Sequence, residues 1–232
     1  FEARDDYGVE FGTARITLDL DSVDRRYGLA TQPDPREAIV VPLPTPITGD
    51  RRNYAESLIE NFSQHPFSNL PVIVTLNAQD ALEQSTQAAG KPMTLPGRRF
   101  FDPMAAAVIE QRRDLLWAAS NAGRIAQVLR AVSHRPDEVF RSETAYLRLR
   151  TILRRIEALA PYGVSPEQQD EIALAMWDLA IMLEEGDLSD ALERLRRAQE
   201  QLAEAMKNGA TDQEIAELMQ ELRDASDDYS RQ

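Results

Sequence analysis

The feature that most constrains this chain is a change of texture near residue 100. Most of the 13 prolines come before it, together with short runs in which apolar and polar residues alternate. Proline and alternation are typical of strands and turns. After this point apolar residues recur every three or four positions, as on one face of a helix. We therefore predict an α+β chain with two domains, residues 1–97 and 98–232.

The first domain is predicted to consist of strands and turns. Alternation marks one strand over residues 9–20, and an apolar β-branched run makes 70–78 the strongest strand candidate. Residues 39–41 and 86–95 are shorter candidates. Residues 53–62 are ambiguous, because their apolar spacing also fits a helix. In this strand-rich context we predict a strand there that pairs with 70–78.

The second domain is predicted to be all-α. Helix starts are marked by an N-capping side chain before an amphipathic run, at Asp102, Ser142 and Ser165. Gly186 is predicted to end the third of these helices, because glycine is common just after a helix C-terminus. Ser189 is then predicted to cap the next helix. The expected architecture is a bundle of five or six helices.

Residues 187–232 are predicted to form a helical hairpin with a coiled-coil-like seam. Apolar residues are spaced alternately four and three apart, interrupted at the Asn-Gly of 208–209. The pattern fits two antiparallel helices of one chain, and it also fits a partner helix from another molecule. We predict self-association or binding of a protein partner through Leu188, Leu192, Leu195, Leu202, Met206, Ile215, Leu218 and Leu222.

Charge divides the chain into three parts. Residues 1–97 hold 8 basic and 14 acidic residues, 98–164 hold 12 and 7, and 165–232 hold 6 and 18, for a net charge of −13. This acidity argues against a nucleic-acid-binding protein. The basic middle part could bind an anionic envelope component, or it could pair with the acidic C-terminal part, which we favour because that charge is on the same chain. The candidate basic patch consists of Arg112, Arg113, Arg148, Arg150, Arg154 and Arg155.

Residues that could carry chemistry are sparse. The chain has no Cys and two His, which excludes thiol nucleophiles and Cys-based metal sites. Neighbouring carboxylates on a helix point about 100° apart, so they do not face each other as a glycosidase requires. We expect no catalytic residues and no cofactor. Weak calcium candidates are present in Asp5, Asp6, Asp19, Asp21 and Asp24, although their spacing lacks the glycine and terminal glutamate of an EF-hand.

Two short stretches of the first domain resemble an immunoglobulin-like β-sandwich that lacks its opening strands. An acidic turn leads through Gly8 and Val9 into a strand, and Ala78-Gln79-Asp80 resembles the strand ending of extracellular bacterial sandwich modules. The chain starts with Phe1 and shows no signal peptide, so we expect a piece of a longer protein or a mature form.

Four further motifs resemble a family of long bacterial membrane-anchored proteins that contain a domain of unknown function. They are Leu-Pro-Gly-Arg-Arg-Phe-Phe-Asp-Pro at 95–103, Glu-Gln-Arg-Arg-Asp-Leu-Leu-Trp at 110–117, Thr-Ala-Tyr-Leu-Arg-Leu-Arg at 144–150 and Asp-Ala-Leu-Glu-Arg-Leu-Arg-Arg-Ala-Gln at 190–199. The resemblance implies membrane helices upstream, a Gln-rich tract downstream and a periplasmic location at the inner membrane. It supplies no activity and no site residues.

These observations together predict a non-enzymatic scaffold or protein-interaction module in the cell envelope. The alternative is an envelope glycan-binding or anionic-ligand-binding protein, or a hydrolase. A concave pocket with convergent titratable groups would favour that alternative.

Overall fold

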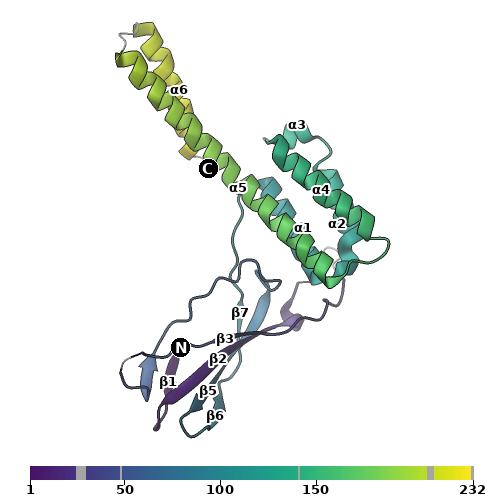
Figure 1. The fold of residues 1–232 in the computed structure, drawn as a ribbon, viewed down its shortest axis with the longest axis vertical. Coiled ribbons are helices and arrows are strands. Elements are labelled where there is room, and N and C mark those ends of the chain that lie inside the picture. Colours follow the sequence, from purple (N-terminus) through teal and green to yellow (C-terminus); the bar gives the residue numbers. More distant parts are fainter. Residues whose placement is uncertain (25–29, 48, 141, 208–211, 231–232) are drawn as a thin grey trace. The chain divides into compact units, whose positions relative to one another are not determined.

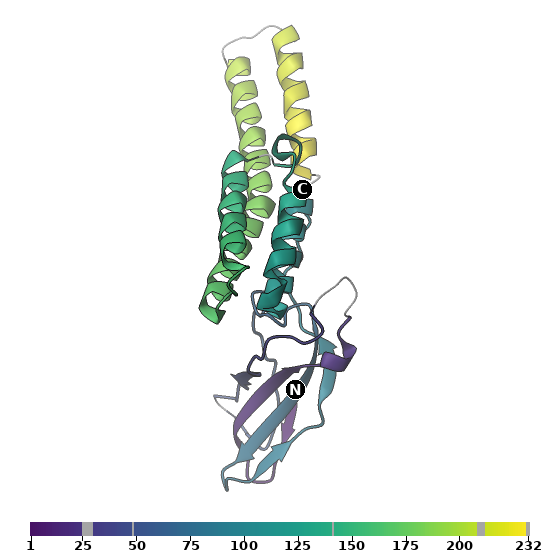
Figure 2. The ribbon, with the colours of Figure 1, turned by 90° about the vertical axis from the view of Figure 1, so that its right-hand side faces the viewer.

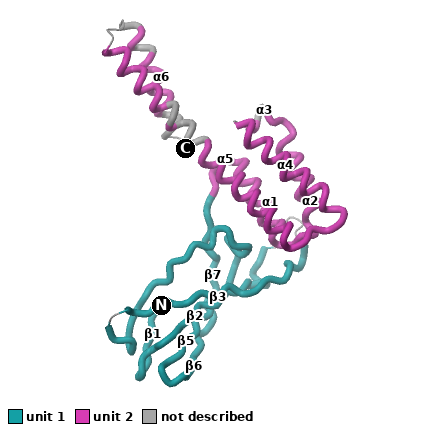
Figure 3. The backbone as a smooth tube through the Cα atoms, in the orientation of Figure 1, with its two compact units in different colours: residues 1–99 teal, residues 100–232 magenta. Residues whose placement is uncertain are grey.

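A computed structural model describes residues 1–24, 30–47, 49–140, 142–207 and 212–230, with the side chains of 137–138, 187–191, 193–194, 212–213, 216–217 and 227–230 left out of the description. The chain is an α+β protein that divides into two compact units, residues 1–99 and 100–232 (Figures 1 and 3). Each unit is described by itself below.

Unit 1 is built around two long antiparallel strands, β2 (Val9–Leu18) and β5 (Pro71–Asp80). Their register places Ile16 opposite Val74 and Ala14 opposite Leu76, so apolar side chains share one face of the sheet. The short strand β3 (Ile39–Pro42) pairs with the outer edge of β2. The strands predicted at 9–20, 39–41 and 70–78 are therefore present with small differences at their ends.

The segment predicted as one strand at 86–95 forms two strands. β6 (Ser85–Gln87) and β7 (Lys91–Thr94) both pair with the remaining edge of β5. Gly90 lies between them, where a Cβ atom would come within 2.7 Å of the Ile73 side chain. This close approach explains why a glycine stands at the break. Pro92 is tolerated in β7 because an edge strand does not need every backbone N–H.

The strand predicted over residues 53–62 is wrong. Only β4 (Asn53–Ala55) is a strand, and it pairs with β1 (Glu2–Arg4) in a separate two-stranded sheet. The physical reason lies in β5, which already has β2 on one edge and β6 with β7 on the other. No edge of β5 is left for a further partner. Leu95, Phe67, Val72 and Ile16 form the small apolar core of unit 1.

Unit 2 contains, among its described residues, the helices α1 (Pro103–Trp117), α2 (Ala122–Val132), α3 (Pro136–Val139), α4 (Glu143–Leu159), α5 (Pro166–Lys207) and α6 (Asp212–Ser230). Single 3₁₀ turns occur at Leu20–Ser22 in unit 1 and Ala119–Asn121 in unit 2. The caps predicted at Asp102 and Ser142 are present. Asp102 accepts a hydrogen bond from the Ala105 N–H at 2.7 Å, and Ser142 caps α4.

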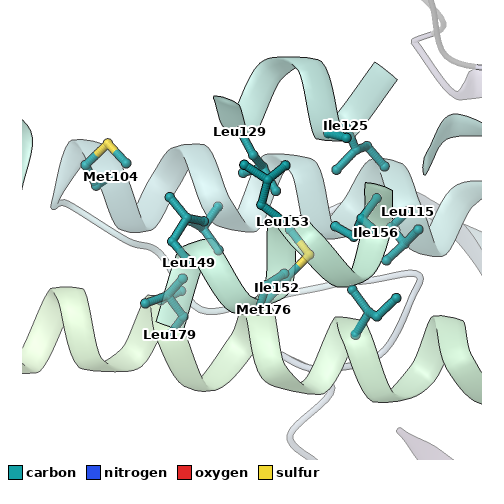
Figure 4. Packing of buried hydrophobic residues seen from close by; sticks show 14 of the residues in the cluster. Met104, Leu115, Ile125, Leu129, Leu149, Ile152, Leu153, Ile156, Met176 and Leu179 are labelled. Atoms are coloured by element: carbon teal, nitrogen blue, oxygen red, sulfur yellow. The ribbon is translucent and has the colours of Figure 1, made fainter. Parts of the chain in front are cut away.

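The core of unit 2 is formed by α1, α2, α4 and the first half of α5 (Figure 4). Its largest fully buried side chains include Leu115 of α1, Leu129 of α2, Leu153 of α4 and Met176 of α5. These side chains recur at helical spacing along each helix, which is why a single apolar stripe per helix suffices to close the core.

The helix break predicted at Gly186 is wrong. α5 runs without interruption through that residue for 42 residues in all, so the backbone of Ser189 lies inside the helix and not at a helix start (Figure 1). Gly186 has no positive φ, unlike a glycine that ends a helix in the left-handed conformation. Packing on both sides of it, at Ala180 and Ala198, outweighs the weak local preference.

The end of α5 and the whole of α6 lie side by side and antiparallel (Figure 2). The link at 208–211 and the predicted cap at Thr211 lie outside the described residues. In the described part of the chain, no helix combines the length and the apolar character that crossing a bilayer requires.

Candidate functional site

The seam of the C-terminal hairpin is formed by one apolar stripe from each helix. The side chains that face the partner helix are half-buried or buried and repeat with spacings of three, four and three: Leu195, Ala198, Leu202 and Ala205 on α5, and Ile215, Leu218, Leu222 and Ala225 on α6. This is heptad spacing. The hairpin therefore closes this stripe within one chain.

The observed seam contains some of the predicted residues but not all of them. Leu195, Leu202, Ile215, Leu218 and Leu222 belong to it, and they are shielded by the partner helix. Two further predicted residues do not: Leu192 and Met206 are 52% and 64% exposed. The side chain of Leu188 lies outside the described residues. The seam uses Ala198 and Ala205, which sequence reasoning missed because it counted only large apolar residues.

The exposed apolar residues share one edge of the hairpin, which we call the apolar edge. Leu192, Gln199 and Met206 are seven residues apart on α5 and so lie on one side of that helix. Met206 directly follows a seam residue, as Met219 does on α6. In an antiparallel pair of helices, the residue that directly follows Ala205 on α5 and the residue that directly follows Leu218 on α6 lie on the same side of the hairpin. Met219 is 45% exposed there.

The predicted basic patch does not form one surface. Arg112 is only 8% exposed. Its Nε donates to the Ala173 carbonyl at 2.8 Å, and its guanidinium lies 5.3 Å from the centre of the Trp177 ring. This arginine therefore joins α1 to α5, with a cation–π contact as part of the link. Arg113, its neighbour in sequence, is exposed on the other side of α1.

The remaining predicted arginines all lie on α4. Arg148, Arg154 and Arg155 are exposed and Arg150 is half-buried. Arg155 forms an ion pair with Glu171 of α5. In the part of the chain that the structure describes, Arg148, Arg150 and Arg154 form no ion pair. α4 therefore presents three cations whose charge is not matched by a neighbouring carboxylate.

Two more ion pairs show where the basic middle part finds its partners. Arg124 lies 2.9 Å from the buried Asp114, and Arg130 pairs with Glu157. Both carboxylates belong to the basic part itself, and of the partners mentioned only Glu171 comes from the acidic part. The more exposed pair, Arg130 with Glu157, contributes about 0–1 kcal/mol.

The calcium candidates do not come together. No group of three or more His, Asp or Glu side chains suited to a metal ion occurs among the described residues, which include all five aspartates, Asp5, Asp6, Asp19, Asp21 and Asp24. Two of them serve local turns. Asp5 accepts hydrogen bonds from the N–H groups of Tyr7 and Gly8 at 2.8 and 2.9 Å, and Asp19 accepts one from Ser22.

A cavity of about 330 Å³ lies in unit 1 and is lined by residues of both sheets, among them Val9, Leu76 and Tyr54. Burial raises the pKa of Tyr54 from its ordinary value. Three acidic residues, Glu2, Asp5 and Asp80, also line the cavity. Asp80 accepts hydrogen bonds from the Leu82 and Gln84 N–H groups at 2.9 and 2.7 Å, so Asp80, like Asp5, stabilises its own turn.

Comparison with known protein families identifies the family of this chain. A model of the family described as domain of unknown function DUF4175 matches residues 1–232. The chain belongs to this family. The expected membership of a family defined by a domain of unknown function is thereby confirmed. No curated protein and no solved structure matches this DUF4175 chain.

Proposed function

We propose that this DUF4175 chain is a non-enzymatic interaction module whose C-terminal hairpin associates with a second copy through the apolar edge. The module would belong to the envelope-facing, periplasmic part of a membrane-anchored bacterial protein. In this proposal the two sheets of unit 1 are a partial immunoglobulin-like sandwich, and the helices of unit 2 form the bundle that carries the hairpin.

The observation that carries the proposal is the exposure of Leu192, Met206 and Met219 on one edge. The seam residues are already covered by the partner helix of the same chain, so the hairpin does not need a second molecule to bury them. The apolar edge is different, because it has no cover within the described residues. A second hairpin laid against it in antiparallel fashion would form a four-helix arrangement.

The strength of this association follows from the exposed area. Burying a large apolar side chain completely contributes about 1.5–3 kcal/mol. Each of the three is already about half covered, so roughly 1 kcal/mol per side chain and copy remains available. Three side chains from each of two copies thus provide roughly 6 kcal/mol. Because association itself is opposed by several kcal/mol, we expect a weak dimer that is populated only at high protein concentration.

The alternative is a binding protein for an envelope glycan or anionic ligand, or a hydrolase. It is supported by the cavity of unit 1. Two of the three acidic residues that line it, Asp5 and Asp80, are engaged by backbone N–H groups, whereas a catalytic acid or base needs to reach the substrate. Glu2 alone does not supply the pair of facing carboxylates that a glycosidase requires. This favours the interaction module.

Sedimentation equilibrium in high salt tests the proposal at the highest protein concentrations that the chain tolerates, because a weak dimer is populated only there. We expect the wild-type chain to dimerise in high salt, because apolar contacts are not screened. The variant Leu192→Gln with Met206→Gln and Met219→Gln should be monomeric in high salt. Leu174→Gln is a matched control, because Leu174 lies on the same helix with the same 52% exposure as Leu192.

Three results would refute the proposal. The wild-type chain could remain monomeric over the whole concentration range, the triple variant could dimerise like the wild type, or Leu174→Gln could weaken the dimer as much as the triple variant does.

A further inference from the structure

The unpaired arginines of α4 are held in place by the core beneath them. Leu149 and Leu153, on the opposite face of the helix, are fully buried. Arg148, Arg150 and Arg154 therefore project from a helix whose orientation is set, and binding an anion there would require little ordering of the backbone.

The arginines form two rows along the exposed side of α4. Arg148 and Arg155 are seven residues apart and share one side, while Arg150 and Arg154 share the other. Between the rows lies an exposed strip without charge, which includes Leu147. Arg155 is already paired with Glu171, so the charges left for a partner are Arg148 on one side and Arg150 and Arg154 on the other. This face therefore suits an elongated partner with several acidic groups.

α6 carries several acidic groups. Over residues 212–230 the sequence has seven Asp or Glu and one Arg, and Glu214 and Glu221 are seven residues apart. Glu221 and Asp224 are exposed. Glu221 lies on the side of α6 away from Met219, because these two positions flank the seam from opposite sides. The acidic face and the apolar edge are thus separate surfaces.

The basic face of α4 and the acidic face of α6 do not form ion pairs with each other within the described residues of one chain. In the described residues α4 packs against α2 and α5, and α6 packs against α5. None of the three unpaired arginines forms an ion pair with a residue of α6. Complementary charge is present on every copy, but it has to come from another molecule.

We propose that the basic face of α4 binds the acidic face of α6 in a second copy of this chain. The contact joins two different surfaces, so it is head-to-tail, and it leads to open chains or closed rings rather than to a symmetric dimer. It acts independently of the apolar edge. The net charge of −13 opposes the approach of a second copy and of an anionic membrane alike, and the second copy is favoured because it offers acidic groups on one face of a helix.

Sedimentation velocity of the full chain at about 20 mM and 500 mM salt tests this contact, because the screening length falls from about 20 Å to about 4 Å between these conditions. We expect assembly beyond the dimer at low salt and its loss at high salt. Two variants, Arg148→Glu with Arg154→Glu and Glu221→Arg with Asp224→Arg, should each raise the apparent Kd about tenfold or more.

The decisive measurement is an equimolar mixture of these two variants. In each variant alone, the face of α4 and the face of α6 carry charge of the same sign, so the variant should not assemble. In the mixture, the acidic α4 of one variant can bind the basic α6 of the other, and assembly should return. The control is Arg99→Glu with Arg113→Glu, which changes the net charge equally at two exposed arginines that do not belong to α4. It should assemble like the wild type. The variant that lacks the apolar edge should keep the salt-sensitive assembly.

The proposal is overturned if the wild-type chain shows no salt-sensitive assembly, or if the mixture does not restore it. A different occupant would be indicated by vesicles containing about 30% phosphatidylglycerol. If the α4 variant loses binding to such vesicles while no form of the protein self-associates, the basic face binds anionic lipid, and contact with a second copy is refuted.

Discussion

Replacement of Gly186 by alanine distinguishes two readings of the longest helix. The sequence pattern makes Gly186 a helix end, whereas the structure places it inside α5. The two readings predict opposite signs for Gly186→Ala. A glycine that ends a helix usually has a positive φ, which alanine adopts only with strain. A glycine inside a helix destabilises that helix relative to alanine.

The structure predicts that Gly186→Ala increases the stability of unit 2. Gly186 has no positive φ, and a Cβ atom built on it would have no atom within 4 Å. Alanine therefore adds no clash and removes the entropic penalty of glycine, so Gly186→Ala should stabilise unit 2 by about 0.5–1 kcal/mol. For a urea m-value of about 2 kcal/mol/M, the midpoint of unfolding should rise by about 0.3–0.5 M.

Urea unfolding followed by circular dichroism at 222 nm measures this shift, because nearly all the helix belongs to unit 2. Gly163→Ala is the matched control. Gly163 follows the end of α4 with φ +88°, so alanine there should lower the midpoint by a similar amount. A lower midpoint for Gly186→Ala, with the control behaving as stated, would mean that the helix ends near residue 186. The reasoning about α5 would then be refuted.

Two further predictions concern the cores of the two units. His65 accepts a hydrogen bond from the Phe67 N–H through Nδ1, and burial, with the nearby Arg36, lowers its pKa from the ordinary 6.5. The folded state thus favours neutral His65. The stability that this residue contributes is therefore complete above pH 6.5 and is lost as the pH falls through the lowered pKa. Urea unfolding of unit 1 between pH 7.5 and 5 should show this loss, and His65→Asn, whose side chain can still accept the hydrogen bond, should abolish the pH dependence. Leu153→Ala should destabilise unit 2 by about 2–5 kcal/mol in the same assay, because Leu153 is 1% exposed, whereas the exposed Leu147→Ala should change stability by less than about 0.5 kcal/mol. A pH-independent unfolding midpoint, or equal effects of the two leucine variants, would contradict these expectations.

Local features of the sequence were sufficient to place most elements. A cap such as Asp102, whose side chain bonds to the N–H of Ala105, involves residues three positions apart, so the sequence contains the whole interaction. The alternation over residues 9–18 likewise indicates which side chains share a face of the sheet. Heptad spacing also indicated a hairpin, because it depends only on helix geometry.

Interactions between distant segments decided the rest. The strand predicted at 53–62 is absent because both edges of β5 are occupied by other strands, and the sequence does not reveal that competition. The seam of the hairpin includes Ala198, since the close packing of α5 against α6 decides which residues face each other. Arg112 is buried against Trp177, while Arg148 and Arg154 remain unpaired on α4. Sequence alone determines local propensity and periodicity, whereas partner choice depends on which surfaces the whole chain brings together.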